Sequence, residues 1–148
     1  MSVETYLLDT NVISHLLAKP EGAVAQRYAA RLLADQPCQM ITSVVVQCEL
    51  LFGLTKKPSQ RLEAAYDIQM ASMSVLPLDD TVPAHYATIR AHLERQGTPI
   101  GPNDTLIAAH ALALNATLVS SDAEFARVPG LRVENWLVAD TTQAALYM

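Results

Sequence analysis

Two acidic residues directly follow short apolar runs that are typical of β-strands. Asp9 comes after Tyr6, Leu7 and Leu8, and Asp122 comes two residues after the run that ends at Ser120. In an open parallel sheet, ligands bind beyond the carboxyl ends of the strands, which predicts both acids at the functional edge. Aspartate is also an ordinary turn residue at strand ends, so these two positions alone leave a site and a turn equally open.

Two further carboxylates fall in predicted helices. The neighbours three and four positions from Glu49 are all non-polar, an unusual setting for a solvated glutamate. Glu49 therefore either meets a cation, a metal or a strong donor, or stands at a border where its head reaches water. Asp104 opens an almost wholly apolar helix, where the helix dipole also favours an aspartate. That helix leads straight into the strand before Asp122, which predicts both acids at one end of the sheet.

Carboxylate clusters of this kind suit hard divalent cations. Magnesium takes a few carboxylates and keeps its other positions for water and substrate phosphate oxygens. Four acids suit one or two Mg²⁺ or Mn²⁺ ions. Two ions roughly 4 Å apart can activate the attacking water and stabilise the leaving oxygen of an in-line phosphodiester displacement. The chemistry predicted for the four acids is hydrolysis without a covalent enzyme intermediate.

The elements that must position these acids alternate along the chain. Predicted strands cover residues 5–8, 38–42, 75–78, 117–120 and 132–136. Predicted helices cover residues 11–18, 23–34, 43–55, 60–72, 82–96 and 103–115, with prolines and glycines falling between the elements. Strands that alternate with helices predict an α/β fold: a three-layer α/β/α sandwich around a central, mostly parallel sheet of about five strands.

Composition indicates one globular domain over residues 1–148, with the last few residues as a flexible tail. The chain is 51% hydrophobic and 17% charged, unlike a disordered chain. Its start lacks a signal-peptide pattern and no apolar run reaches membrane-spanning length, so we expect a cytoplasmic protein without a membrane partner. Cys38 and Cys48 form neither a CxxC pair nor a disulfide framework, and we interpret both as buried and reduced.

The formal net charge of -5 argues mildly against a nonspecific nucleic-acid binder. A carboxylate-rich metal site supplies several of the negative charges, and bound divalent cations would reverse the local sign where a phosphate must sit. Arg27 and Arg31 lie one helical turn apart, which we interpret as a solvated helix face in preference to a phosphate contact.

Four segments in order resemble PIN-domain ribonucleases and, within that family, the VapC-type toxins of bacterial toxin–antitoxin pairs. They are LLDTNVIS at residues 7–14, CELLFG at 48–53, NDTLIAAHA at 103–111, and LVSSDAEF at 118–125 followed by VPGL at 128–131. The resemblance covers essentially the whole chain and implies a PIN-like fold with a central parallel sheet between helices.

This resemblance implies an endoribonuclease whose acidic quartet binds magnesium or manganese; its members here would be Asp9, Glu49, Asp104 and Asp122. Asn11 would steady the site, and the Ser120 hydroxyl would position a ligand or water, although helix capping or turn formation is the alternative for both. Glu124 is an alternative ligand to Asp122. The resemblance also implies a homodimer, and a cognate antitoxin whose tail wraps the toxin and places an arginine in the acidic pocket.

Two other functions remain as alternatives. A phosphoryl-transfer hydrolase could use the aspartate after the first strand as its nucleophile, but position 11 is Asn11 and no lysine follows Lys57 to stabilise the charge. A catalytically idle interaction module could use the same acids to attract a basic partner. No GxSxG elbow or zinc-ligand spacing is present, and His110 on its apolar helix is interpreted as a core residue.

Overall fold

The central element of the protein is a parallel sheet, seen in a computed structural model that describes residues 3–138. The strands are β1 (Glu4–Leu8), β2 (Cys38–Ser43), β3 (Ser74–Leu76), β4 (Thr117–Val119) and β5 (Val133–Glu134). Their order in the five-stranded sheet is β3-β2-β1-β4-β5, with every pairing parallel. The chain therefore moves outward from β1 in one direction to β3 and then returns to the other side of β1.

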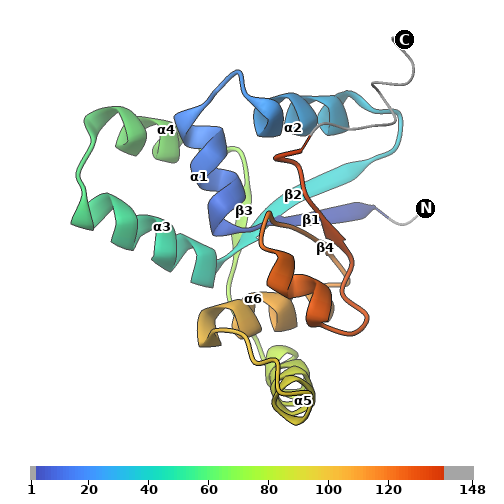
Figure 1. Ribbon diagram of the computed structural model, residues 1–148. Helices are drawn as coiled ribbons and strands as arrows, with labels where there is room; N and C mark the ends of the chain where they lie inside the picture. Colours follow the sequence, from blue (N-terminus) through green and yellow to red (C-terminus); the bar gives the residue numbers. More distant parts are fainter. Residues whose placement is uncertain (1–2, 139–148) are drawn as a thin grey trace.

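This change of direction sets the layers. The helices are α1 (Thr10–Ala18), α2 (Ala23–Leu33), α3 (Val44–Lys56), α4 (Gln60–Ala71), α5 (Val82–Arg95) and α6 (Pro102–Ala113). Because crossovers between parallel strands are right-handed, connections that run in opposite directions place their helices on opposite faces. Figure 1 shows α1, α2 and α4 above the sheet and α5 and α6 below it. The α/β prediction is confirmed.

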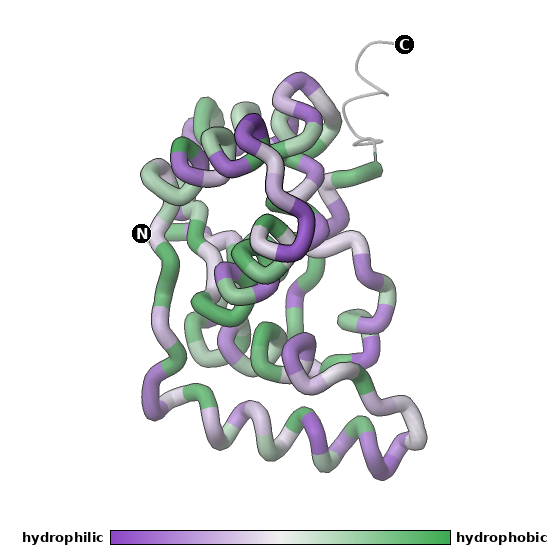
Figure 2. Tube along the Cα trace, turned by 90° about the vertical axis from the view of Figure 1, so that its left-hand side faces the viewer, coloured by the Kyte–Doolittle hydropathy of each residue, from purple (hydrophilic) through white to green (hydrophobic). Residues whose placement is uncertain are grey.

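The core lies between the sheet and these helices, with β1 at its centre. Tyr6, Leu7 and Leu8 are fully buried, as expected for a strand covered on both faces. Helix α6 is packed between the sheet and α5 and is buried over most of its length, with small residues such as Ala108 and Ala109 facing the core. Helix α5 is the outer element, and along the bottom of Figure 2 its turns alternate between hydrophobic and hydrophilic.

The predicted bounds agree with the structure to within about two residues. Ser43, predicted as the first residue of a helix, is instead the N-cap of α3 and accepts a hydrogen bond from the Val45 amide. Helices α5 and α6 each have a proline in their first turn, where no amide hydrogen is needed. A short 3₁₀ helix, Ala123–Arg127, was not predicted. The predicted C-terminal tail lies outside the described residues.

Within residues 3–138, no helix combines the length and the apolar composition that crossing a bilayer requires.

Candidate metal centre

The candidate site lies where the chain reverses direction across the sheet, between β1 and β4. Leu8 pairs with Val119, and the Asp9 amide donates to the Val119 carbonyl at 2.9 Å. Asp9 and the residues that follow β4 therefore leave the sheet side by side. Crevices at such reversal points, beyond the carboxyl ends of the strands, are where open α/β sheets bind ligands.

Asp9 is the buried acid of this site, with only 4% of its surface exposed. Its backbone caps helix α1, yet its carboxylate forms no capping bond and instead accepts from Ser120 Oγ at 2.7 Å and from Asn11 Nδ2 at 3.3 Å, both through Oδ2. Burial raises the pKa of Asp9, and the negative charges of Glu49 and Asp122 raise it further, while the Ser120 bond lowers it. The carboxylate is thus fixed in place but is costly to ionise.

Asn11 and Ser120 connect the two loops that carry the acids. Asn11 Oδ1 accepts from the Ser121 amide at 3.1 Å, while Ser120 Oγ accepts from the Asp122 amide at 3.1 Å. Together with their bonds to Asp9, these contacts join the start of α1 to the loop after β4. The two supporting residues named from the sequence are therefore placed directly against the acidic site.

Asp104, Asp122 and Glu124 form the tightest carboxylate cluster among residues 3–138, with one oxygen of each lying within 4.8 Å of the others. Asp104 comes from the first turn of α6, and Asp122 caps the 3₁₀ helix by accepting from the Glu124 amide at 2.9 Å. That turn brings Glu124 beside Asp122. Burial, with repulsion from Asp9 and Asp122, raises the pKa of Asp104 to about 6.

Glu49 lies at the border of the site. Its side chain is half-buried, and its Oε1 accepts from Thr10 Oγ1 at 2.7 Å. The sequence predicted either a strong hydrogen-bond donor beside Glu49 or a position at the border of the protein, and the structure shows both. Glu49 accepts from Thr10 and is partly exposed, and Phe52, one helical turn away, is 67% exposed. The charge of Glu49 contributes to the raised pKa values of Asp9 and Asp104, although it is not part of the three-carboxylate cluster.

The donor set fits a hard divalent cation. All five acidic groups offer carboxylate oxygens, and within the described chain no lysine, arginine or histidine forms an ion pair with any of them. Like charges held together in this way repel one another, and a bound cation would relieve that repulsion. Among the described residues no lysine is paired with Asp9, whereas a phosphoaspartyl mechanism would need a cation that stabilises the charge there.

Of the side chains that shape this geometry, Thr10 was not identified from the sequence, and Glu124 was identified only as an alternative to Asp122. Thr10, between Asp9 and Asn11, holds Glu49, and its only signal was its place directly after a strand-ending acid. Glu124 was considered as a replacement for Asp122, whereas the structure brings both into the cluster with Asp104. The turn that aligns them depends on a capping bond that could not be predicted from composition alone.

The PIN domain family matches residues 6–131, a span that includes every acid of the site. The chain belongs to the PIN domain family, which confirms the resemblance stated from its motifs.

Relatives within this family share most of their length with the chain. It is 35% identical over 133 residues to ribonuclease VapC2 of Rickettsia felis and 34% identical over 134 residues to the tRNA(fMet)-specific endonuclease VapC of Shigella flexneri; each match covers 88% of this chain and 97% of the relative. The fold is similar to that in the crystal structure of VapBC2 from R. felis bound to a promoter DNA fragment, with a TM-score of 0.80, 34% identity, and coverage of 89% of this chain and 98% of that one. The crystal structure of DNA-bound VapBC from Salmonella typhimurium is similar too, with a TM-score of 0.78 and 31% identity. That match covers 91% of this chain and 99% of the other.

Proposed function

We propose that this chain is a metal-dependent endoribonuclease and the toxin of a toxin–antitoxin pair. The observation that carries the proposal is the convergence of Asp9, Glu49, Asp104 and Asp122 on one edge of the sheet, from four separate segments, without a compensating cation among the described residues. The naming of relatives at 34–35% identity as ribonuclease and endonuclease supports the same reaction class.

The proposed ligands of Mg²⁺ or Mn²⁺ are Asp9, Asp104 and Asp122, with Glu49 at the border and Glu124 beside Asp122. A bound divalent cation would supply positive charge to the phosphate and make a nearby water more acidic. The raised pKa of Asp104 fits this assignment, because a bound cation would offset the repulsion from the acidic neighbours that disfavours its ionised form.

The chain's own residues prepare the site before substrate arrives. Ser120 holds Asp9 in one orientation, and Asn11 ties the loop that carries Asp122 to the start of α1. Thr10 holds Glu49 at the opposite border of the site. Fixed donors of this kind reduce the reorganisation needed when charge develops on the reacting phosphate.

We propose RNA as the substrate, with transfer RNA as the first molecule to test. One relative is named a tRNA(fMet)-specific endonuclease at 34% identity over 88% of this chain. A cytoplasmic location belongs to the same proposal, because that is where a bacterial toxin would meet this RNA. The formal net charge of -5 indicates that affinity for RNA must come from bound cations and local contacts rather than from overall charge.

We propose that a cognate antitoxin binds the groove beside Glu49. This groove of about 330 Å³ is lined mainly by apolar atoms of α1, α3 and α4, including Leu17, Leu50 and Leu54, and its lining also includes Thr10 and Glu49. An amphipathic segment could bury its apolar side there and direct a basic residue toward the acids. Similar solved structures of VapBC proteins, one of them a member of the VapBC family of toxin–antitoxin systems, support this partner.

We also propose that the chain forms a homodimer, as its resemblance to VapC-type toxins implies. Light scattering on the purified protein should give twice the chain mass of 16.1 kDa.

The test is cleavage of total cellular RNA, including transfer RNA, by the purified protein with Mg²⁺ or Mn²⁺. Reactions with EDTA and with Asp9→Asn run beside it, and sequencing maps the new RNA ends. We expect discrete cuts that disappear in both controls, while circular dichroism shows that the variant is folded. Asparagine keeps the size of the side chain and its capacity to accept from Ser120, so loss of cleavage would report the missing charge.

The result that would overturn the proposal is cleavage by Asp9→Asn equal to that of the wild type. No cleavage across cellular RNA, together with no saturable metal binding, would instead favour the interaction module. A calorimetric titration with Mn²⁺ separates the alternatives further, because a module that only attracts a basic partner needs no saturable site that Asp9→Asn abolishes.

A further inference from the structure

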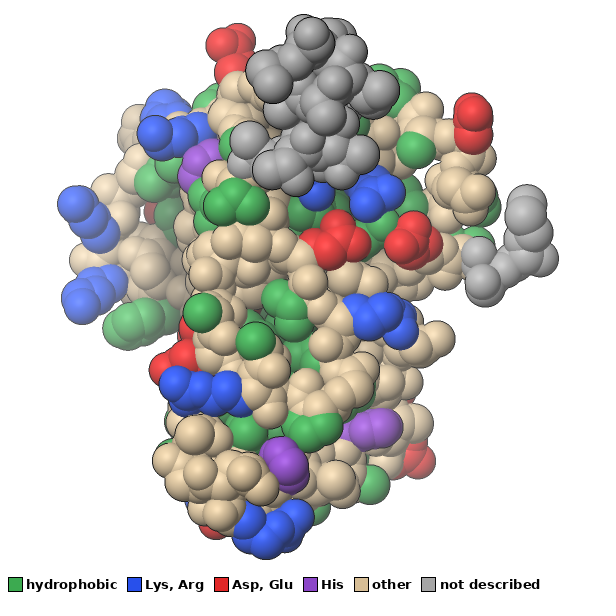
Figure 3. All heavy atoms as spheres, turned by 45° about the vertical axis from the view of Figure 1, so that its right-hand side comes forward, with side chains coloured by type: hydrophobic (Ala, Val, Ile, Leu, Met, Phe, Trp, Pro, Cys, Tyr) green, Lys and Arg blue, Asp and Glu red, His purple; other side chains and the backbone are tan. Residues whose placement is uncertain are grey.

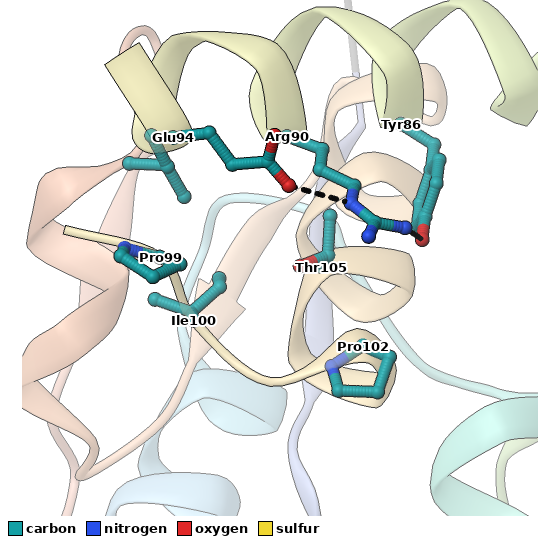
Figure 4. A pocket seen from close by; sticks show the side chains of 8 residues that line it. Tyr86, Arg90, Glu94, Pro99, Ile100, Pro102 and Thr105 are labelled. Carbon is teal, nitrogen blue, oxygen red and sulfur yellow. Dashed lines mark hydrogen bonds and ion pairs between the residues drawn. The ribbon is translucent and has the colours of Figure 1, made fainter. Parts of the chain in front are cut away.

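A pocket of about 190 Å³ lies between α5, the loop that follows it, and the start of α6. Figure 4 shows the side chains of Tyr86, Arg90 and Glu94 along α5 on one side, with Pro99 and Pro102 on the other. The walls therefore combine an aromatic ring and two proline rings with one cation and one anion. None of these residues belongs to the acidic cluster.

Arg90 lines this pocket, and two hydrogen bonds fix the orientation of its side chain. Its Nη1 donates to the Tyr86 hydroxyl at 3.0 Å and its Nε donates to Glu94 Oε1 at 3.1 Å, each partner being one helical turn away (Figure 4). An exposed arginine–glutamate pair on a helix adds little stability. Its side chains, 60% and 58% exposed, remain open to a ligand that approaches from solvent. No described hydrogen bond uses Arg90 Nη2, which leaves that donor for such a ligand.

The pocket and the acidic cluster both use residues at the start of α6. Thr105, which lines the pocket, directly follows Asp104, and its hydroxyl donates to the Gly101 carbonyl at 2.9 Å. A β-carbon placed on Gly101 would lie 3.9 Å from Asp104 Oδ2. This loop therefore lines the pocket with Pro99 and Ile100, and its last residue, Gly101, lies next to a proposed metal ligand. A nucleotide next to a phosphate at the acids would lie close to the pocket.

We propose that this pocket is a subsite for one unpaired base of the RNA, with guanine preferred; the inference rests on the proposed ribonuclease function. Unpaired bases are recognised by stacking on aromatic and guanidinium planes and by hydrogen bonds to their edges. Arginine donors match the O6 and N7 acceptors of guanine. The Glu94 carboxylate can accept from the neighbouring N1 and N2 donors of the same base. Guanine alone presents these two edges side by side.

The surface charge also favours a discrete subsite. On the face shown in Figure 3, basic and acidic side chains are interspersed and form no broad basic band. A protein with a formal net charge of -5 cannot rely on general phosphate attraction to select its RNA. We therefore expect the protein to select its RNA through a few contacts with bases near the acids.

The first experiment uses single-stranded RNA that carries one 6-thioguanosine, photo-crosslinked to the purified protein and mapped by mass spectrometry. This readout does not depend on cleavage. We expect crosslinks within residues 86–105, reduced about tenfold in Arg90→Ala. Arg95→Ala is the matched control, because it removes the same charge from the same helix at an exposed residue outside the pocket. Arg90→Lys keeps the charge but loses the planar fork, and should lose the crosslink as well.

The second experiment sequences the ends that the same proteins produce from a random RNA pool with Mn²⁺. Wild type and Arg95→Ala should cut with guanine enriched at one position beside the cut, and Arg90→Ala should cut without that enrichment. Crosslinks elsewhere, equal crosslinking in Arg90→Ala and Arg95→Ala, or cleavage without guanine enrichment would overturn the subsite. Crosslinking at the pocket with no cleavage of any RNA would support the subsite while contradicting the proposed nuclease.

Discussion

Two carboxylates lie near each other in the sheet order, Glu134 on β5 and Asp122 just beyond the neighbouring strand β4, and their surroundings are opposite. Glu134, on β5, accepts from Trp136 Nε1 at 3.0 Å and lies 3.5 Å from Arg31 Nη2. Asp122, beyond β4, faces Asp104 and Glu124 and has no ion pair with a described cation. Compensated charge at Glu134 contributes to packing, whereas uncompensated charge at Asp122 is what the proposed cation site requires.

The region around Glu134 also corrects one interpretation made from the sequence. Arg27 and Arg31 were interpreted as a solvated helix face, but they approach Glu134 at 4.0 Å and 3.5 Å, and the Arg31 guanidinium lies 5.4 Å from the centre of the Tyr6 ring. They tie α2 to the edge of the sheet. A contact between segments about a hundred residues apart could not be read from their spacing on one helix.

The largest effect should come from removing a charge on the uncompensated side. We expect Asp104→Asn to lower the rate of metal-dependent RNA cleavage on the order of 10²-fold or more, because the site loses a charged cation ligand. Single-turnover cleavage of the RNA identified from the cellular pool measures it. Glu134→Gln removes the same charge on the compensated side and should keep the wild-type rate. An equal loss of cleavage rate in Asp104→Asn and Glu134→Gln would contradict the proposed difference between the two carboxylates.

A smaller loss of rate is expected from the residue that orients Asp9. Ser120→Ala removes the 2.7 Å hydrogen bond to Asp9 Oδ2 and the acceptor of the Asp122 amide. Groups that orient metal ligands typically contribute about 10- to 100-fold, and we expect about tenfold here in both Mn²⁺ affinity and cleavage. Calorimetric titration and cleavage assays give the two values. Ser120→Thr, which keeps the hydroxyl, should restore most of both; if it does not, Ser120 acts through packing alone.

The strands and helices, and the edge on which the acids lie, could be predicted because their signals are local. Apolar runs ending at Asp9 and just before Asp122 define strand ends, and prolines and glycines separate the elements. The Ser120–Asp9 bond could not be predicted, since it requires β4 to lie beside β1 rather than beside β3. The same holds for the bond between Thr10 and Glu49 and for the pocket between α5 and α6.

On the compensated side, the expected effect is on stability instead of rate. Glu134→Ala leaves the Nε1–H of Trp136, a fully buried residue, without its described acceptor. An unsatisfied buried donor costs about 1–3 kcal/mol, so we expect the free energy of unfolding to fall by about 2 kcal/mol. Urea denaturation monitored by tryptophan fluorescence measures this change. Glu134→Gln retains a carbonyl acceptor and should lose less; an equal loss would assign the effect to the ion pair with Arg31.

The smallest effect is a pH-dependent gain in stability on the uncompensated side. The folded-state pKa of Asp104 is about 6, above its ordinary value of 3.8, because of burial and its acidic neighbours. The folded protein therefore binds this proton more tightly than the unfolded chain, and the resulting stability is lost as pH rises from about 4 through 6. Asp104→Asn avoids that loss. Without metal, it should be more stable than the wild type at pH 7 by about 1 kcal/mol, after allowance for solvent screening.

Comparing the two proteins at each pH isolates this carboxylate. Burial lowers the pKa of His110, so its contribution to stability is lost as pH falls below about 6.5, the opposite direction, and it is present in both proteins. Urea denaturation in EDTA between pH 4 and 8 should show the difference shrinking below pH 6. At pH 7, saturating Mn²⁺ should make the wild type more stable than Asp104→Asn, because only the wild type keeps the full set of metal ligands. A difference that is independent of both pH and metal would mean that Asp104 serves only the start of α6.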